Sequence, residues 1–341
     1  MSPAPRPLGR VLLTGVPGWL TTAMLDSLRD QPPHGLTAVR CMVQPDFLPA
    51  ARERPVQLPV PVEYVAADLR DDGSLAEAAK GVDTIFHAAG ILHVRRTRDW
   101  YNINTAGTRR LLDGALAGGV TRFVNVSSNA AAGRSDSRER LLTEDDPPMP
   151  LSHYGRSKWL AEELLNAAAD QIEVVNLRPC MFYGPPVPTR HVEIYKRIIH
   201  GKMPLVGSGD YARSLSHIDN LVQGCRLAMS HPAAKGETYY LSDRRTYTTK
   251  KVVEAMAAAC GVAPRYLRLP AIVGPIAFAG DITLAAMQLY WQTLHLVGES
   301  HWHVGVSCEK AVRELGYDPK VEIDEGMKGA VEWCRRQGLL N

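Results

Sequence analysis

Residues 11–21, VLLTGVPGWLT, hold the first evidence for the architecture of this 341-residue chain. An apolar run that can form a strand leads into a turn with Gly15 and Gly18, and then into a segment that can form a helix. Such a turn brings backbone N–H groups and a helix N-terminus close to a pyrophosphate. Thr21 stands where a third glycine is usual, so it either pushes helix and strand slightly apart or bonds a backbone carbonyl through its hydroxyl. Two glycines alone are equally typical of an ordinary turn.

Strand-like and helix-like segments alternate through the first half of the chain. We expect strands at 11–14, 37–43, 62–66, 84–87, 122–127 and 173–177, and helices at 19–30, 73–80, 100–117 and 153–169. Short connections between such segments predict an α/β fold of Rossmann type, a doubly wound parallel sheet with its ligand at the carboxyl ends of the strands. After residue 180 prolines and glycines crowd 184–188 and 203–209 and the alternation stops. We therefore expect a dinucleotide-binding domain at 8–180, to which parts of 210–245 return, and a smaller, discontinuous substrate lobe mainly within 181–341.

The composition excludes several classes of protein. A net charge of +3 with 22% charged residues gives no nucleic-acid footprint, and the densest basic cluster, Arg95-Arg96-Thr97-Arg98, is broken by Asp99 and is typical of a solvated loop. No run of 18 uncharged apolar residues occurs; the nearest, 269–280, is stopped by Asp281, so no membrane span is expected. No apolar segment precedes Val11, so no signal peptide is expected and the predicted location is cytoplasmic.

The six cysteines form no CxxC pair and no Cys/His metal spacing. Several lie inside apolar runs, so we expect free, buried thiols in a reducing compartment and no metal site.

The segment His153-Tyr154-Gly155-Arg156-Ser157-Lys158 carries the strongest chemical signal. Tyr154 and Lys158 are four residues apart and project from one face of the predicted helix. A tyrosine titrates near pH ~10, and a nearby ammonium together with an oxidised nicotinamide favours its phenolate; a shift of about 3 units is worth roughly 4 kcal/mol. Ser127-Ser128, at the end of the predicted strand before this helix, offers a hydroxyl to a substrate oxygen. Each feature is common alone, but their order after a glycine turn predicts a hydride-transfer site.

At this point the chain resembles the extended short-chain dehydrogenase/reductase family over nearly its whole length. The motifs that carry the resemblance are Thr14-Gly15-x-x-Gly18, Asp68-Leu69-Arg70-Asp71, His87-Ala88-Ala89-Gly90, Asn104-Thr105-Ala106-Gly107-Thr108, Arg178-Pro179 with Tyr183-Gly184-Pro185, Arg213-Ser214-Leu215-Ser216-His217-Ile218-Asp219 and Glu314-Leu315-Gly316-Tyr317-Asp318-Pro319. Thr21 is the departure from the glycine motif and is interpreted as a tolerated variation.

The resemblance implies a role for each residue that matches a motif. Tyr154 is the acid/base, Lys158 lowers its pKa and binds the nicotinamide ribose, and Ser128, the better match of the two serines, holds the substrate oxygen. The implied cofactor-binding residues are Thr14, Gly15, Pro17, Gly18, Trp19, Leu20, Gln44, Asp68, Leu69, His87, Ala88, Ala89, Gly90, Asn104, Ser127, Tyr154, Lys158 and Pro179. The implied substrate residues are Ser128, Asn129, Tyr183 and Arg213.

The cofactor is expected to be NAD or NADP, with a slight preference for NAD. An acidic residue after Val43 would bind the adenine ribose and an arginine would favour NADP, but Gln44 does neither. Asp46 is expected to turn outward, and Arg52 and Arg54 to be solvated.

Three branches of the family compete for the substrate. Dehydratases are disfavoured because Asn129-Ala130 stands where they carry an Asp-Glu pair. Sugar-nucleotide 4-epimerases clamp a diphosphate with an arginine at the position of Arg213, although a surface ion pair to Asp210 or Asp219 would explain that residue equally well. Hydroxysteroid dehydrogenases and related reductases take apolar alcohols or ketones, and we favour this branch because residues 267–298 are long and apolar and place Phe278, Tyr290 and Trp291 to roof the site.

Two further possibilities stay open. The apolar stretch could instead be lobe core or a dimer face, and a homodimer through helices 100–117 and 153–169 is possible. The chain could also be a cofactor-binding regulator, against which the intact set of Ser128, Tyr154 and Lys158 argues.

Overall fold

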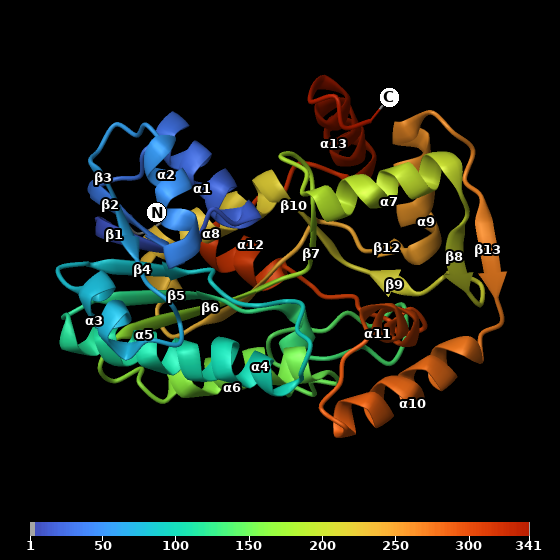
Figure 1. Ribbon diagram of the computed structural model, residues 1–341, viewed down its shortest axis with the longest axis horizontal. Helices are drawn as coiled ribbons and strands as arrows, with labels where there is room; N and C mark the ends of the chain where they lie inside the picture. The colour runs from blue at the N-terminus through green and yellow to red at the C-terminus, as the bar shows by residue number, and fades with distance from the viewer. Residues whose placement is uncertain (1–3, 341) are drawn as a thin grey trace.

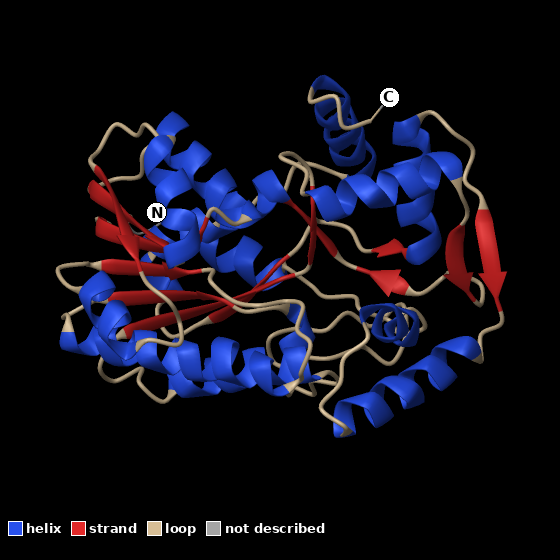
Figure 2. Cartoon of the chain, in the orientation of Figure 1, coloured by secondary structure: helices blue, strands red, loops and turns tan. Residues whose placement is uncertain are grey.

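A seven-stranded sheet in the order β11-β6-β5-β4-β1-β2-β3 lies at the centre of the computed structural model, which describes residues 4–340 (Figures 1 and 2). Its strands are β1 (Gly9–Val16), β2 (Leu36–Val43), β3 (Val62–Ala66), β4 (Thr84–His87), β5 (Arg122–Val126), β6 (Glu173–Pro179) and β11 (Thr238–Leu241). Every neighbouring pair is parallel. The order reverses between β1 and β4, which is the switch point of a doubly wound sheet, so the predicted Rossmann-type fold is confirmed.

Helices cover both faces of this sheet. One face carries α1 (Trp19–Asp30), α8 (Ile218–Ser230) and α12 (Glu309–Leu315), and the other α3 (Asp72–Ala79), α5 (Ala106–Ala117) and α6 (His153–Asn166). Successive strand residues point to opposite faces, so Leu12 packs with the second group of helices and Leu13 with the first. A short helix, α2 (Leu48–Glu53), lies beside β3.

The helix expected over 100–117 is present, but it is not a regular α-helix throughout. The chain forms α4 (Arg98–Trp100), a π-helical turn at Tyr101–Thr105 and then α5. In a π-helical turn a side chain points in a direction that it would not have in a regular α-helix. Here the buried residue of the turn is Asn104, whose amide bonds other segments at the sheet edge. The helix expected to reach 169 also ends earlier, at Asn166.

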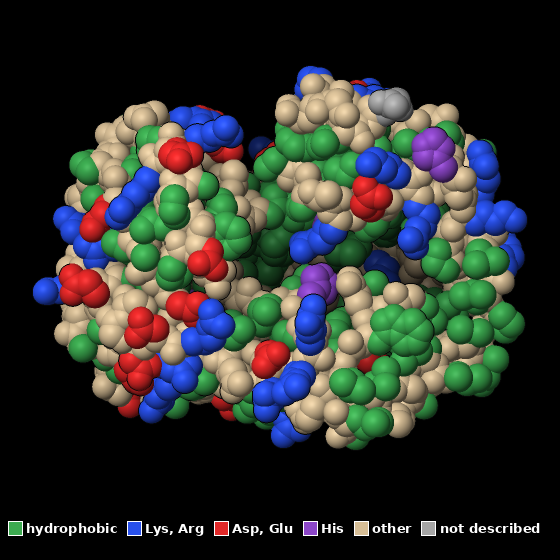
Figure 3. Space-filling model, viewed as in Figure 1, with side chains coloured by type: hydrophobic (Ala, Val, Ile, Leu, Met, Phe, Trp, Pro, Cys, Tyr) green, Lys and Arg blue, Asp and Glu red, His purple; other side chains and the backbone are tan. Residues whose placement is uncertain are grey.

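The second half builds a separate core beside the sheet. Its strands are β7 (Met181–Tyr183), β8 (Met203–Val206), β9 (Ala212–Arg213), β10 (Leu215–His217), β12 (Tyr247–Thr248) and β13 (Tyr266–Leu269), and its helices are α7 (Thr189–His200), α9 (Thr249–Cys260), α10 (Val273–Ala286), α11 (Gln292–Glu299) and α13 (Ile323–Arg336). Apolar side chains of α7, α9 and α13 pack together, while α10 and α11 pair with each other. Figure 3 shows a hollow between this half and the sheet.

Three segments of this second half belong with the first. Helix α8 packs on the sheet and β11 pairs with β6, both from within 210–245, and α12, from outside that range, packs on the same face as α8. The division of the chain into domains at 8–180 and 181–341 stays a prediction.

All six cysteines are free and buried, as expected. Between residues 4 and 340, no helix combines the length and the apolar character needed to cross a bilayer.

Candidate active site

The glycine turn lies against the end of β4. Gly15 has φ +89°, and a Cβ there would lie 2.9 Å from the backbone nitrogen of Ala89. The N–H of Gly18 donates to the carbonyl of Gly15 at 2.7 Å, and a Cβ on Gly18 would lie 2.6 Å from that same oxygen. Both positions therefore require glycine, and the turn is packed tightly enough to hold its backbone N–H groups in place at the start of α1.

Thr21 strengthens this turn rather than disrupting it. Its hydroxyl lies 2.9 Å from the carbonyl oxygen of Gly15 and 2.9 Å from that of Gly18, and its side chain is buried. The expectation that the hydroxyl bonds a backbone carbonyl is confirmed, and the residue that replaces the third glycine ties the helix to the turn.

A buried chain of hydrogen bonds joins β1, β4 and α5. The hydroxyl of Thr14 lies 2.8 Å from Nδ1 of His87, Nε2 of His87 lies 3.0 Å from the hydroxyl of Thr108, and that hydroxyl donates to the carbonyl of Asn104 at 2.6 Å. Burial, with the charge of Lys158, lowers the pKa of His87 to about 3, so its ring is neutral. Because the proton of Thr108 goes to Asn104, His87 must donate from Nε2 and accept at Nδ1. The free lone pair of Thr14 then accepts the N–H of Ala89 at 3.1 Å, which fixes the segment at the end of β4.

Asn104 fixes the next residues of the same segment. Its Oδ1 accepts the N–H of Ile91 at 2.8 Å, and its Nδ2 donates to Ser157 of α6 at 3.1 Å. A Cβ on Gly90 would lie 3.1 Å from Oδ1 of Asn104 and 3.8 Å from Nζ of Lys158. The structure thus brings Gly90, Asn104 and Lys158 together.

The residues expected at the adenine end also lie close to one another. Asp68 accepts a hydrogen bond of 2.6 Å from Arg70, and this bond, against a smaller opposing effect of burial, lowers the pKa of Asp68; Gln44 contributes a further hydrogen bond. Arg52 donates to the carbonyl of Tyr64 at 3.4 Å. Asp68 is therefore an ionised acceptor at the end of β3.

Helix α6 carries Tyr154 and Lys158 from a well-defined start. Ser152 caps it by accepting the N–H of Gly155 at 3.1 Å. Burial raises the pKa of Tyr154, while a hydrogen bond with Ser128 and the charge of Arg190 lower it. Ser128 caps the short turn after β5 by accepting the N–H of Ala130 at 3.2 Å, and its hydroxyl lies 3.4 Å from Oδ1 of Asn129. The structure brings Ser128 and Tyr154 together.

The ammonium of Lys158 is held in the interior at the end of β5. Its Nζ donates to the carbonyl of Val126 at 2.7 Å, and burial lowers its pKa to about 8. The proposed role of Lys158 in lowering the pKa of Tyr154 stays a prediction.

Two features of the site were missed from the sequence. Glu162, one helical turn beyond Lys158, accepts hydrogen bonds from Arg178 at 2.6 and 3.1 Å, and both side chains are buried. This ion pair fastens α6 to β6, and an acid four residues after the lysine was its only signal. Arg190, at the start of α7, gave no signal, because its approach to Tyr154 depends on how the second half packs.

Two of the expected substrate residues, Tyr183 and Arg213, use their polar groups in bonds within the protein. The hydroxyl of Tyr183 donates to Asp243 at 2.7 Å in the interior. Arg213 donates to the carbonyls of Trp302, Ser300 and Glu299, at 2.5 to 3.1 Å, and burial lowers its pKa to about 10. Its guanidinium therefore caps the end of α11 and forms neither of the surface ion pairs considered from the sequence.

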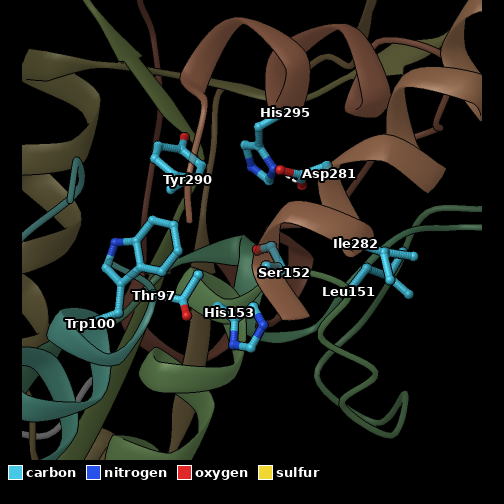
Figure 4. A pocket seen from close by; sticks show the side chains of 10 residues that line it. Thr97, Trp100, Leu151, Ser152, His153, Asp281, Ile282, Tyr290 and His295 are labelled. Carbon is cyan, nitrogen blue, oxygen red and sulfur yellow. Dashed lines mark hydrogen bonds and ion pairs between the residues drawn. The ribbon is translucent and has the colours of Figure 1, made fainter. Parts of the chain in front are cut away.

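Trp100 and Tyr290 line a pocket between α6 and α10 (Figure 4). The ring of Trp100 stands edge-on to Tyr154 at 6.4 Å and to Tyr290 at 4.7 Å. On the far wall His295 bonds Asp281 at 2.7 Å and Glu299 at 3.2 Å, and these bonds outweigh burial and raise its pKa to about 10.

The expected roof is therefore only partly correct. Tyr290 reaches the neighbourhood of Tyr154 through Trp100, but Phe278 packs on Trp302 at 4.7 Å and Trp291 is 59% exposed. These two side chains were misplaced because the sequence does not reveal which side of α10 and α11 faces inward.

The residues at the sheet edge fit a dinucleotide. Gly15 and Gly18 form a cradle that a Cβ would fill. The hydroxyl of Ser127 and the indole nitrogen of Trp19 are buried without a hydrogen-bond partner in the part of the chain that the structure describes. A bound cofactor with hydroxyl and phosphate oxygens would supply acceptors for such groups.

The chain matches known proteins over most of its length. The model of the NAD dependent epimerase/dehydratase family matches residues 11–242. An uncharacterized protein, y4nL, of Sinorhizobium fredii is 34% identical, with 96% of each chain covered. The 2-alkyl-3-oxoalkanoate reductase of Stenotrophomonas maltophilia is 27% identical, covering 78% of this chain and 85% of the relative, and the 3-beta-hydroxysteroid dehydrogenase of Mycolicibacterium neoaurum is 26% identical, covering 94% and 90%.

Solved structures share the fold. MoeE5 in complex with UDP-glucuronic acid and NAD superimposes with a TM-score of 0.74 at 23% identity, covering 96% of this chain and all of that one.

Proposed function

Because the chain belongs to the NAD-dependent epimerase/dehydratase family, we propose that it interconverts a secondary alcohol and a ketone on an apolar substrate. The proposed catalytic residues are Ser128, Tyr154 and Lys158. The relatives include dehydrogenases and reductases of the extended short-chain type, so the chain is an NAD(P)-dependent enzyme of that kind.

The observation that carries the proposal is the aromatic wall beside Tyr154. Trp100 is 2% exposed and links the rings of Tyr154 and Tyr290. Aromatic rings stabilise apolar ligands by removing large surfaces from water, at about 25 cal/mol per Å². A steroid-like or alkyl ketone suits this wall better than a hexose does.

The proposed chemistry assigns one task to each residue. When bound, NAD or NADP supplies the redox chemistry, accepting a hydride from an alcohol carbon or returning it to a ketone. Tyr154 accepts the hydroxyl proton at its phenol oxygen, or donates it in the reverse direction. Ser128 donates a hydrogen bond to the reacting oxygen and stabilises the charge that develops there. Lys158 places a positive charge one helical turn from Tyr154, where the cofactor ribose is expected.

A second candidate is a sugar-nucleotide 4-epimerase. The family description includes epimerases, and a UDP-glucose 4-epimerase of Vibrio cholerae is among the relatives. The bonds of Arg213 argue against this candidate, since its donors point at the carbonyls that end α11 rather than at a diphosphate. The charge of Arg190 lowers the pKa of Tyr154, and a cation near the reacting carbon supports an otherwise apolar substrate with one acidic group, such as the 3-oxoalkanoate in the name of the Stenotrophomonas relative.

The test is a cofactor and substrate assay on the full chain. The purified protein is denatured, and released nicotinamide cofactor is identified by absorbance and mass. The native protein is then assayed for NAD(P)-linked turnover of 2-alkyl-3-oxoalkanoates, hydroxysteroids and simple secondary alcohols, and for interconversion of UDP-glucose and UDP-galactose. We expect exchangeable cofactor and turnover of at least one apolar substrate. Tightly retained NAD with epimerisation of the sugar nucleotide would overturn the proposal in favour of the epimerase, and cofactor binding without any turnover would favour the regulator.

A further inference from the structure

The outward side of α10 and α11 is an exposed apolar face. We define this apolar face by Ile272, Ile276, Ile282, Met287, Trp291 and Leu296, which are 53–65% exposed. In Figure 3 hydrophobic side chains gather at the lower right, where Figure 1 places these two helices. Soluble monomers rarely expose so many large apolar side chains side by side, and such faces mark interaction sites.

No charged side chain interrupts the apolar face. Asp281 is the only acidic residue in 269–298, and no lysine or arginine occurs there. The carboxylate of Asp281 turns inward to His295, and both side chains are 13% exposed. The hydroxyl of Thr283 is satisfied by the carbonyl of Ala279 at 2.8 Å. The polar groups of Asp281 and Thr283 on α10 therefore both have hydrogen-bond partners within the protein.

Arginines flank the apolar face at both ends. At the end of α10, Thr97 bonds Gln288 through its hydroxyl at 2.9 Å, which holds the exposed Arg95, Arg96 and Arg98 beside the face. At its beginning lie two more exposed arginines, Arg265 just before β13 and Arg268 within it. Among the described residues, Arg95 and Arg96 form no ion pair, and Arg98 reaches only Asp99, at 4.0 Å.

We propose that the apolar face docks on the surface of a bilayer that contains anionic lipids. The apolar side chains enter the headgroup region, Trp291 lies at the level that tryptophan prefers, and the flanking arginines bind lipid phosphates. Helix α10 has 14 residues, fewer than the roughly 20 needed to span, so it lies in the plane of the interface. A charge-free apolar strip with basic ends is the pattern of such interfacial helices.

A second copy of the chain fits this face less well. In an antiparallel pairing of two α10 helices, the arginines at one end would meet those at the other end of the partner. The exposed face offers no carboxylate to neutralise them, since Asp281 is held by His295. The like charges of the flanking arginines oppose such a dimer, whereas lipid phosphates carry the opposite charge and would neutralise these arginines.

Docking also bears on the pocket beside Tyr154, although it does not depend on the proposed substrate. Ile282 of the apolar face lines the same pocket as Trp100 and Tyr290. A docked molecule would therefore hold that pocket next to the lipid, where an apolar substrate dissolves.

The experiment is co-sedimentation of the full chain with vesicles, without substrate. One vesicle contains phosphatidylcholine with phosphatidylglycerol, and the other phosphatidylcholine alone. We expect binding to the anionic vesicles that weakens as salt is raised. Arg95→Ala/Arg96→Ala should weaken it about 5-fold for each arginine removed. Ile276→Asp/Trp291→Ser should abolish it, because a carboxylate then enters the lipid.

Matched controls are Leu339→Asp and Arg336→Ala, which change an exposed leucine and an exposed arginine near the C-terminus. The six positions changed in the test and control variants (95, 96, 276, 291, 336 and 339) are all exposed. The midpoint of thermal unfolding should therefore be unchanged in every variant, and measuring it checks that each variant is folded. Binding that survives Ile276→Asp/Trp291→Ser would overturn the proposal. Failure of the full chain to bind either vesicle would also overturn it. A dimer of the wild type in sedimentation velocity that Ile276→Asp/Trp291→Ser dissociates would do the same. None of these results depends on enzymatic turnover.

Discussion

The ammonium of Lys158 donates a 2.7 Å hydrogen bond to the carbonyl of Val126, and this bond joins α6 to the end of β5. It lies in the interior, where burial disfavours the charged form and lowers the pKa of the lysine to about 8. The bond therefore positions the residue, while its burial reduces the stability of the protein wherever the lysine carries its charge.

This cost predicts a pH dependence of stability. The unfolded chain keeps the ordinary lysine pKa of 10.5, above the folded value of about 8, so it binds more protons between these limits. The free energy of unfolding of the wild type, relative to Lys158→Met, should rise as pH is raised from 8 to 10.5, by up to roughly 3 kcal/mol. Urea unfolding of both proteins at pH 7.5 and pH 10 measures this. The exposed Lys328→Met is the control, and a difference that stays constant with pH would contradict the prediction.

Tyr154→Phe should remove turnover and keep the cofactor. Loss of the phenol removes the proposed acid/base group, so kcat should fall about 10²- to 10⁴-fold. The affinity for NAD, measured by calorimetry, should change little, because the ring keeps its contact with Trp100. Tyr101→Phe is the control, since its hydroxyl bonds His153 at 2.7 Å beside the same helix. Wild-type kcat in Tyr154→Phe would exclude the assigned role.

Thr21→Val tests the substitute for the third glycine. Valine keeps the volume but removes the hydroxyl that bonds the carbonyls of Gly15 and Gly18, so the free energy of unfolding should fall by about 1–2 kcal/mol. Affinity for NAD should fall with it, because the turn is less firmly held. Thr22→Val is a neighbouring control, whose hydroxyl lies 3.4 Å from the carbonyl of Pro17. Equal stability of the two variants would show that these bonds contribute nothing.

Gln44→Asp should shift cofactor preference toward NAD. A carboxylate at the end of β2 accepts bonds from ribose hydroxyls and repels a 2′-phosphate, so the ratio of kcat/KM for NAD over NADP should rise by about tenfold. Steady-state assays with each cofactor measure the ratio. Removing a nearby exposed charge with Asp46→Asn serves as the comparison. An unchanged ratio for Gln44→Asp would mean that residue 44 does not reach the ribose.

Local signals explain why the sheet could be predicted. β1, α1 and β4 follow from apolar runs, turn residues and helix periodicity that lie within a few residues of each other. The π-helical turn at Tyr101–Thr105 could not be predicted, because Asn104 bonds Ile91 and Ser157, which are distant in sequence.

The site divides in the same way. The pattern of Ser128, Tyr154 and Lys158 was visible in the sequence, and their roles and the cofactor contacts remain predictions. The buried pair of Glu162 and Arg178 was not visible, because an exposed and a buried ion pair look alike in sequence. The inner side of α10 was missed for a related reason, since apart from Asp281 and Thr283 its residues are apolar or glycine and their pattern marks no inner face, and the position of Trp291, which precedes α11, depends on how these helices pack.

The last strand of the sheet imposes an order on synthesis. β11 pairs with β6, yet residues 180–237 must leave the ribosome between them. Until then the backbone groups of β6 on that edge have no partner, and α8, which covers the same region of the sheet, is also missing. A nascent chain stalled in this interval would present an open strand edge to chaperones and to other unfinished chains. Stop codons between residues 180 and 237 should therefore yield aggregates rather than a separable nucleotide-binding fragment.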